Sequence, residues 1–179
     1  MIYIICLLSA TGVLALDLIT KYLAESLNFN FVVIPELLKF KLTYNTGAAF
    51  SFLSSESWAM TFFIIITIIT LLLILGYFIF NVVKKRKVSK WLLIALSLVF
   101  SGALGNMIDR LLFQKVRDFI FVFYNTRIFP AIFNVADMSL VVGVIMICIY
   151  LLFLDKDAVF KKKNKQTEPQ KGEINDDKS

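Results

Sequence analysis

The chain has 179 residues, of which 59% are hydrophobic, and its mean hydropathy is +0.78. Soluble domains reach only about 45–50% apolar residues, so this excess predicts a membrane protein. The 19 Lys and Arg residues outnumber the 13 Asp and Glu residues and give a formal net charge of +6. There is no His, which excludes Ser/His/Asp and Cys/His nucleophiles and His-ligated metal sites. We expect neither a metal nor a cofactor, so any hydrolytic chemistry would use carboxylates, hydroxyls, Lys or Arg.

Four apolar blocks are long enough to cross a bilayer, because a helix rises about 1.5 Å per residue and the hydrocarbon core is about 30 Å thick. The predicted spans are residues 1–23, 59–83, 91–110 and 131–154. No basic residue precedes the first block and further spans follow it, so we interpret it as a retained helix rather than a removable signal peptide. Cys6 and Cys148 lie inside apolar blocks, where each is expected to serve as a small apolar side chain.

The basic residues predict the orientation of the chain, since cytoplasmic connections of membrane proteins carry an excess of Lys and Arg. Five of them lie between the second and third spans, and seven more follow Leu154. Both termini are therefore expected in the cytoplasm, with residues 155–179 forming a basic, disordered tail. This topology accounts for the net charge, and no nucleic-acid partner is expected.

The two predicted outer connections, residues 24–58 and 111–130, contain strand signals. Polar and apolar residues alternate from Lys39 to Tyr44, which is typical of a half-buried strand. Residues 118–124 are also strand-like, so we expect a small sheet on the outer face. The predicted fold class is an all-α membrane protein, a bundle of four transmembrane helices that carries this sheet.

Three shorter segments of these connections have signals of their own. Residues 45–47 favour a turn, and residues 48–53 favour a short amphipathic helix lying at the membrane interface. Phe129-Pro130 is expected to mark the entry into the fourth helix.

Four carboxylates are predicted at one depth, just below the outer surface. By the helical rise, Asp17 lies about 24 Å along the first span and Asp109 lies about 27 Å along the third. Asp137 is expected about two turns into the fourth span, and Asp118 enters from the outer connection at a similar height. The bundle therefore gathers its acidic residues near one end.

Helical spacing also places polar residues on common faces. Pairs at i, i+3 and i, i+4 are neighbours on a helix surface, and small residues allow helices to pack closely. The three predicted stripes are Asp17 with Lys21; Gly102, Gly105, Asn106, Asp109 and Arg110; and Asn134 with Asp137. We expect the three stripes to converge on one site.

Structural explanations compete with this functional one. Asp17 and Lys21 would fit a pair that extends to the membrane interface, and Asp109 with Arg110 would fit a pair that fixes the outer end of the third helix. Asp137 has no adjacent cation, and an intramembrane carboxylate indicates a functional site.

Two nearby carboxylates are the remaining groups that can provide both acid and base catalysis. Like charges a few ångströms apart resist joint ionisation, so one carboxyl keeps its proton while the other acts as a base. Asp118 and Asp137 are the best pair, because they can face each other across the outer end of the bundle. Asn134, Asn106 and Arg110 are expected nearby, where they would orient the carboxylates or bind the substrate.

Five segments, taken together and in order, resemble the lipoprotein signal peptidases, the type II signal peptidases of bacteria. The segments are Asp17-Leu-Ile-Thr-Lys21, Asn45-Thr-Gly-Ala-Ala-Phe50, Gly102-Ala-Leu-Gly-Asn-Met-Ile-Asp-Arg110, Val116-Arg-Asp-Phe-Ile120 and Phe133-Asn-Val-Ala-Asp137. The resemblance covers residues 16–137 and leaves out the basic tail. It implies a four-helix bundle with a small extracytoplasmic β-sheet cradle.

The resemblance also implies an activity, a location and a site. It implies an aspartic endopeptidase of the bacterial plasma membrane that removes signal peptides from prolipoproteins, N-terminal to a diacylglyceryl-modified cysteine. Its catalytic dyad would be Asp118 and Asp137, near the outer leaflet surface. Supporting or substrate-binding roles are expected for Asp17, Lys21, Asn45, Gly102, Asn106, Asp109, Arg110 and Asn134. The expected partners are prolipoprotein substrates and membrane lipids, and the protein is expected to be a monomer.

Two residues depart from the family pattern. Arg117 precedes Asp118 where the family often has an apolar residue, and strand alternation predicts that its side chain points away from the dyad. Met138 follows Asp137 where Ser is frequent, so a supporting hydrogen bond is expected to be lost.

Ion or proton transport is the competing function, because buried carboxylates also form proton relays. A relay should distribute ionisable groups through the depth of the membrane, whereas the second span has no charged residue. A purely structural scaffold would leave the three converging polar stripes unexplained.

Overall fold

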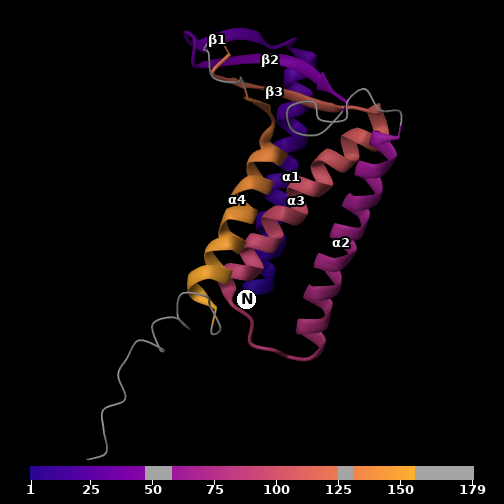
Figure 1. The fold of residues 1–179 in the computed structure, drawn as a ribbon, viewed down its shortest axis with the longest axis vertical. Coiled ribbons are helices and arrows are strands. Elements are labelled where there is room, and N and C mark those ends of the chain that lie inside the picture. The colour runs from indigo at the N-terminus through magenta and orange to yellow at the C-terminus, as the bar shows by residue number, and fades with distance from the viewer. Residues whose placement is uncertain (47–57, 125–130, 156–179) are drawn as a thin grey trace, which may run out of the picture.

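The computed structural model describes residues 1–46, 58–124 and 131–155. The four apolar blocks form four long helices, each long and apolar enough to cross a membrane (Figure 1). Their bounds are α1 Ile2–Ser26, α2 Ala59–Val83, α3 Lys90–Phe113 and α4 Val135–Ile149, and α4 continues as the π-helix η2, Tyr150–Leu154. The predicted all-α bundle is confirmed.

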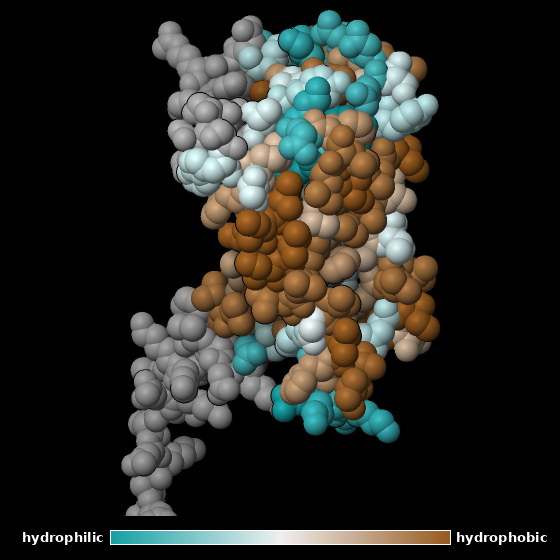
Figure 2. Space-filling view, turned by 90° about the vertical axis from the view of Figure 1, so that its right-hand side faces the viewer, coloured by the Kyte–Doolittle hydropathy of each residue, from teal (hydrophilic) through white to brown (hydrophobic). Residues whose placement is uncertain are grey.

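Helix α3 lies at the centre of the bundle and contacts each of the other three helices. Half of its most apolar stretch is buried, against 11% in each of the other helices. Many of the other apolar side chains are exposed, and the face drawn in Figure 2 has a hydrophobic band over the helices between two hydrophilic ends. An apolar surface of this extent is stable in lipid rather than in water.

Small residues allow α4 to pack closely on α3. A Cβ atom at Gly102 would collide with the carbonyl oxygen of Ala136, and one at Gly143 would lie 2.8 Å from the carbonyl oxygen of Ala95. Ser139 donates a hydrogen bond to the carbonyl oxygen of Leu98 across the same interface, at 2.8 Å. The polar face of α3 is thereby held against the start of α4.

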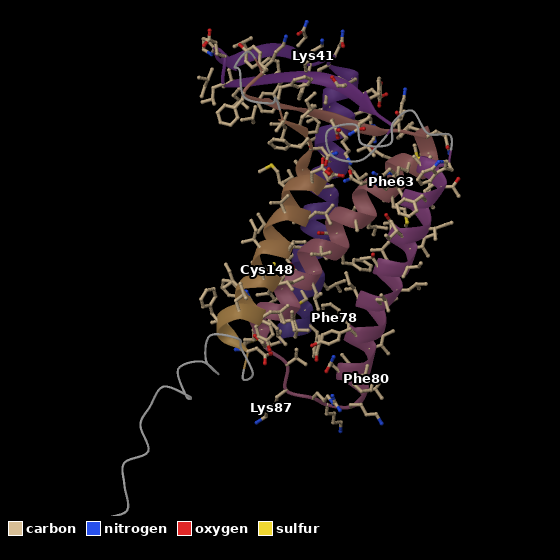
Figure 3. The ribbon with its side chains drawn as sticks, in the orientation of Figure 1. Lys41, Phe63, Phe78, Phe80, Lys87 and Cys148 are labelled. Atoms are coloured by element: carbon tan, nitrogen blue, oxygen red, sulfur yellow. The ribbon has the colours of Figure 1, made fainter. Side chains whose placement is uncertain are left out.

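A four-stranded antiparallel sheet covers one end of the bundle, which we call the sheet end (Figure 1). Its order is β1-β2-β3-β4, with β1 Asn30–Ile34, β2 Leu38–Asn45, β3 Val116–Val122 and β4 Ala131–Phe133. Strands β2 and β3 confirm the two sequence predictions. The N-terminus and the α2–α3 connection lie at the opposite end, and Figure 3 places Lys41 on the sheet and Lys87 at that opposite end.

The beginning of the fourth helix differs from its predicted position. Residues 131–133 form strand β4, which pairs with β3, and α4 begins only at Val135. The reason is a capping box, in which Asn134 and Asp137 exchange hydrogen bonds between side chain and backbone. Asp137 therefore lies in the first turn of α4, and the expected depth of two turns is wrong.

Some predicted element boundaries differ slightly from the structure, and other predicted segments lie outside the described residues. Helix α1 extends to Ser26 and α3 extends to Phe113. Asn45 is the last residue of β2, and Gly47 of the predicted turn lies outside the described residues. The interfacial helix at residues 48–53, the entry at Phe129-Pro130 and the tail from residue 156 onward lie outside the described residues.

Candidate active site

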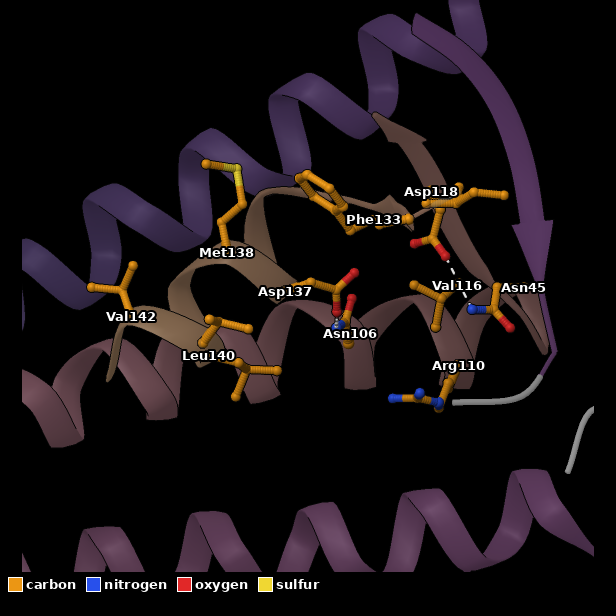
Figure 4. Close-up of a pocket in the computed structure, with 13 residues that line it drawn as sticks. Asn45, Asn106, Arg110, Val116, Asp118, Phe133, Asp137, Met138, Leu140 and Val142 are labelled. Atoms are coloured by element: carbon orange, nitrogen blue, oxygen red, sulfur yellow. Dashed lines mark hydrogen bonds between the residues drawn. The ribbon is translucent and has the colours of Figure 1, made fainter. Parts of the chain in front are cut away.

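A cavity of about 560 Å³ opens between the start of α4, the end of α3 and the sheet (Figure 4). One part of its wall is polar and carries both residues of the predicted dyad. The polar lining residues are Asn45, Asn106, Arg110, Asp118 and Asp137. The apolar lining residues are Val116, Ala131, Ile132, Phe133, Met138, Leu140, Val141 and Val142. The cavity thus joins a polar end to an apolar groove along α4.

Strand β3 and two amide side chains hold Asp118. The strand is buried from Val116 to Phe119, and Asp118 itself is 2% exposed. Asn134 Nδ2 donates to Oδ1 of Asp118 at 2.7 Å, and Asn45 Nδ2 donates to Oδ2 at 3.1 Å. Each carboxyl oxygen of Asp118 therefore has a donor.

The capping box at the start of α4 fixes Asp137. The backbone N–H of Asn134 donates to Oδ2 of Asp137 at 3.1 Å, and Asn106 Nδ2 donates to Oδ1 at 2.7 Å. Figure 4 shows the carboxyl groups of Asp118 and Asp137 directed into the same space in the cavity. Asn134 contacts both of them, so the two acids form one hydrogen-bonded unit.

The surroundings of Asp118 make its protonated form available near neutral pH. Burial raises the pKa of Asp118 to about 7, and the charge of Asp137 adds to the effect, against the hydrogen bonds from Asn45 and Asn134. Two neighbouring carboxyls that resist joint ionisation are an acid and base pair.

A buried ion cluster lies beneath the dyad and consists of Asp17, Lys21 and Asp109, all completely buried. Lys21 Nζ lies 2.8 Å from Oδ2 of Asp17 and 3.4 Å from Oδ2 of Asp109. It also donates to Oδ1 of Asn106 at 3.0 Å. Because the pair is buried and bonded to the site, the interpretation of Asp17 and Lys21 as an interfacial pair is wrong.

The ion cluster also supports α4 directly. Asp17 Oδ1 accepts a hydrogen bond from the backbone N–H of Ala136 at 2.9 Å, one residue before Asp137. A Cβ atom at Gly105 would lie 2.5 Å from Oδ2 of Asp17, so only glycine fits there without displacing the carboxylate. Gly102 and Gly105 thus serve the packing of α3 against its neighbours rather than lining the cavity.

Asp109 does not pair with Arg110 as the sequence suggested. Its partners are Lys21 and Arg117, and the Arg117 guanidinium also contacts Glu25. The side chain of Arg117 is therefore bonded away from the dyad, as strand alternation predicts. No sequence pattern indicated the contact with Glu25, because the two residues are 92 positions apart.

Arg110 has a different environment. It lines the cavity, and its guanidinium carbon lies 5.3 Å from the centre of the Phe63 ring. Within the described parts of the chain Arg110 forms no ion pair, and its buried Nε has no hydrogen-bond partner. The cavity therefore contains a cation with donors to offer.

Comparisons with known proteins decide the family. Residues 9–153 match the family model described as signal peptidase (SPase) II. The lipoprotein signal peptidases of Staphylococcus aureus strains JH9 and Newman are 42% identical to the chain over 163 residues, covering 88% of the chain and 91% of each relative. The chain belongs to the signal peptidase II family.

Solved structures agree with this membership. One bacterial membrane enzyme, determined by the in meso method at 2.3 Å resolution, matches with a TM-score of 0.69 and 36% identity, covering 94% of both chains. A second, determined at 1.9 Å, matches with a TM-score of 0.68 and 38% identity, covering 83% of this chain and 92% of the other. This signal peptidase II chain is thus a multi-pass membrane protein and an aspartic-type hydrolase, and the resemblance drawn from the five motifs is confirmed.

The geometry brings together every residue predicted for the site of this signal peptidase. Asp118, Asp137, Asn45, Asn106 and Arg110 line the cavity. Asn134 bridges the two acids, and the ion cluster and the two glycines lie behind them. Transport gains no support, because these carboxylates all lie near the sheet end.

Proposed function

We propose that this signal peptidase removes signal peptides from diacylglyceryl-modified prolipoproteins, cutting on the N-terminal side of the lipidated cysteine. Asp118 and Asp137 are the catalytic residues in this proposal. The observation that carries it is the single cavity in which two carboxyls, bridged by Asn134, lie beside an apolar groove. The names of the relatives support the substrate class.

The environments of the two acids suggest which is the acid and which is the base. Asp118 is the more deeply buried, and its raised pKa favours the proton donor. Asp137 lies in the first turn of α4, where the unpaired N–H groups of the helix carry partial positive charge. We therefore assign the base to Asp137 and the acid to Asp118.

In the proposed reaction both carboxyl groups return to their starting protonation states. Water adds to the scissile carbonyl carbon while Asp137 takes its proton and Asp118 protonates the carbonyl oxygen. The tetrahedral intermediate then breaks its C–N bond. The leaving amine takes the proton held by Asp137, and the hydroxyl of the new carboxyl group returns a proton to Asp118.

The rest of the cavity fits a lipidated peptide. The groove formed by Ile132, Met138, Val141 and Val142 is apolar and suits an acyl chain. At the polar end, the Nε of Arg110 has no hydrogen-bond partner among the described residues, and its N–H suits a carbonyl oxygen of the peptide. All the site residues come from one chain, which supports a functional monomer.

The location of the site follows from the basic residues. The connection between α2 and α3 lies at the end opposite the sheet (Figure 1), and it and the first residue of α3 carry Lys84, Lys85, Arg86, Lys87 and Lys90. The positive-inside rule then supports a cytoplasmic location for that end and, with it, a position for the dyad near the outer leaflet surface. A lipid anchor would hold the scissile bond at the same height.

Purified protein incubated with a diacylglyceryl-modified prolipoprotein and with its unmodified form tests this function. We expect cleavage of the modified form and little or none of the unmodified form, with mass spectrometry placing the cut before the cysteine. Equal cleavage of both forms would contradict lipid-dependent recognition. Cleavage of neither would contradict the proposed activity.

A further inference from the structure

Arg117, the residue before the proposed acid Asp118, is buried and contacts several charged and aromatic side chains. Arg117 is 6% exposed, although it lies in a strand of the sheet outside the helix bundle. Its backbone N–H donates to Oδ2 of Asp109 at 2.9 Å, Nη2 donates to Oδ1 at 2.7 Å, and Nε approaches Oδ2 at 3.4 Å. A guanidinium that grips both carboxylate oxygens fixes orientation as well as distance.

The same side chain reaches a second helix. Arg117 Nη1 donates to Oε2 of Glu25 at 2.9 Å, and the guanidinium carbon lies 4.4 Å from the centre of the Phe113 ring. Glu25 belongs to α1 and Asp109 to α3. One residue therefore joins the start of β3 to two helices, immediately before the strand presents Asp118 to the cavity.

The contacts of Arg117 with Asp109 and Glu25 form a clamp, and Asp109 connects this clamp to Asp137. The second partner of Asp109 is Lys21, which donates to Asn106, and Asn106 in turn donates to Asp137. Arg117 thus reaches Asp118 through one peptide unit and Asp137 through a chain of buried contacts.

We propose that Arg117 is a positioning residue, which sets the place and direction of the Asp118 carboxyl by clamping β3 to α1 and α3. The inference rests on the proposed function, because it concerns the same hydrolysis. Misplacement of a catalytic group by about 1 Å can lower a rate by about 100-fold.

We expect the charge of Arg117 to affect the dyad as well. The fully buried carboxylates of Asp17 and Asp109 are balanced by Lys21 and Arg117, and Arg117 also pairs with the partly exposed Glu25. The other charged groups that interact with Asp118 are Asp137 from α4, Lys21 from α1 and Arg110 from α3. Tyr44 of β2 contacts only Glu25 of this network, through its hydroxyl. Loss of the Arg117 charge would leave one excess negative charge near the dyad and favour its protonated form.

Two substitutions distinguish the effect of Arg117 on the position of Asp118 from the effect of its charge. Arg117→Lys keeps the charge but cannot grip both oxygens of Asp109, whereas Arg117→Met removes both charge and grip. Lys115→Met is the matched control, because Lys115 is a cation two residues away whose Nζ lies 3.5 Å from the centre of the Tyr44 ring, outside the clamp. kcat, KM and the pH profile are measured per folded enzyme with a lipidated substrate, and thermal unfolding is followed in detergent.

We expect Arg117→Lys to lower kcat about tenfold, with KM nearly unchanged and the pH profile in place. Arg117→Met should lower kcat further and move the alkaline limb of the pH–rate profile to higher pH by about half a unit or more. Lys115→Met should behave as the wild type. If Arg117→Met does not fold, Glu25→Gln replaces it, and its loss in kcat should be smaller than that of Arg117→Lys, because the grip on Asp109 remains.

Wild-type kcat in Arg117→Lys, or an equal loss in Lys115→Met, would overturn the inference. A lower yield of folded enzyme with unchanged kcat would also overturn it, since Arg117 would then serve only the fold. These results differ from failure of the proposed function, in which the wild type itself would leave the lipidated substrate uncut and the inference would fall with it.

Discussion

Asn134 contacts both carboxyl groups of the proposed dyad. Its amide group donates to Asp118, while its backbone N–H and side-chain oxygen complete the capping box with Asp137. One residue therefore starts α4 and connects the two acids. The sequence predicted Asn134 beside Asp137 from their spacing, but not the bond to Asp118, because that contact depends on where β3 docks.

The raised pKa of Asp118 predicts the pH dependence of cleavage. The proposed acid must be protonated, so kcat/KM should fall as the pH rises through about 7. Asn45→Ala removes a hydrogen bond that favours the ionised form, so the pKa of Asp118 should rise and the alkaline limb should move to higher pH. A shift of about one to two units is expected, since a hydrogen bond to a charged group contributes about 1.5–3 kcal/mol and one pKa unit is about 1.4 kcal/mol.

Initial rates of cleavage between about pH 5 and 9 measure this shift. An alkaline limb that stays in place in Asn45→Ala, or moves to lower pH, would contradict the assignment of Asp118 as the acid.

At the scale of elements, the long apolar runs and the i, i+3 and i, i+4 spacings were sufficient to predict the bundle and its polar faces. Strand β2 was predictable from its alternation, but β1 was not, because Phe31, Val32, Val33 and Ile34 give no period of two. The start of α4 was misplaced because residues 131–133 are apolar, and only pairing with β3 makes them a strand. Local sequence carries no information about that partner.

Close packing of α1 against α3 gives a stability prediction. Gly105→Ala should lower the free energy of unfolding by about 1–3 kcal/mol, because the added methyl group would meet Oδ2 of Asp17. Gly76→Ala is the matched control, since a Cβ atom there meets nothing within 4 Å. It should be neutral or stabilising, because Ala favours a helix more than Gly does by about 1 kcal/mol.

Thermal unfolding of both variants in the same detergent makes the comparison. Equal melting temperatures would show that the α1–α3 contact tolerates the methyl group and would contradict this account of Gly105.

For the whole molecule, the sheet at one end of the apolar helices and the basic connection at the other support the proposed orientation in the membrane (Figures 2 and 3). Lys41→Cys should react with a membrane-impermeant maleimide applied to intact cells. Lys87→Cys should react only after the membrane is opened. The unsubstituted chain, which carries Cys6 and Cys148, supplies the background. The reverse pattern would contradict the proposed topology.

The proposed hydrolysis depends on two carboxyls acting together at the sheet end of a membrane bundle. Its most direct test is cleavage of a diacylglyceryl-modified prolipoprotein by the full-length wild type, Asp118→Asn and Asp137→Asn, with Glu36→Gln as an exposed acidic control on the sheet side. We predict that each dyad variant remains folded in the membrane but loses at least about 100-fold in rate, while Glu36→Gln cleaves like the wild type. Normal turnover by either folded dyad variant would contradict the central claim.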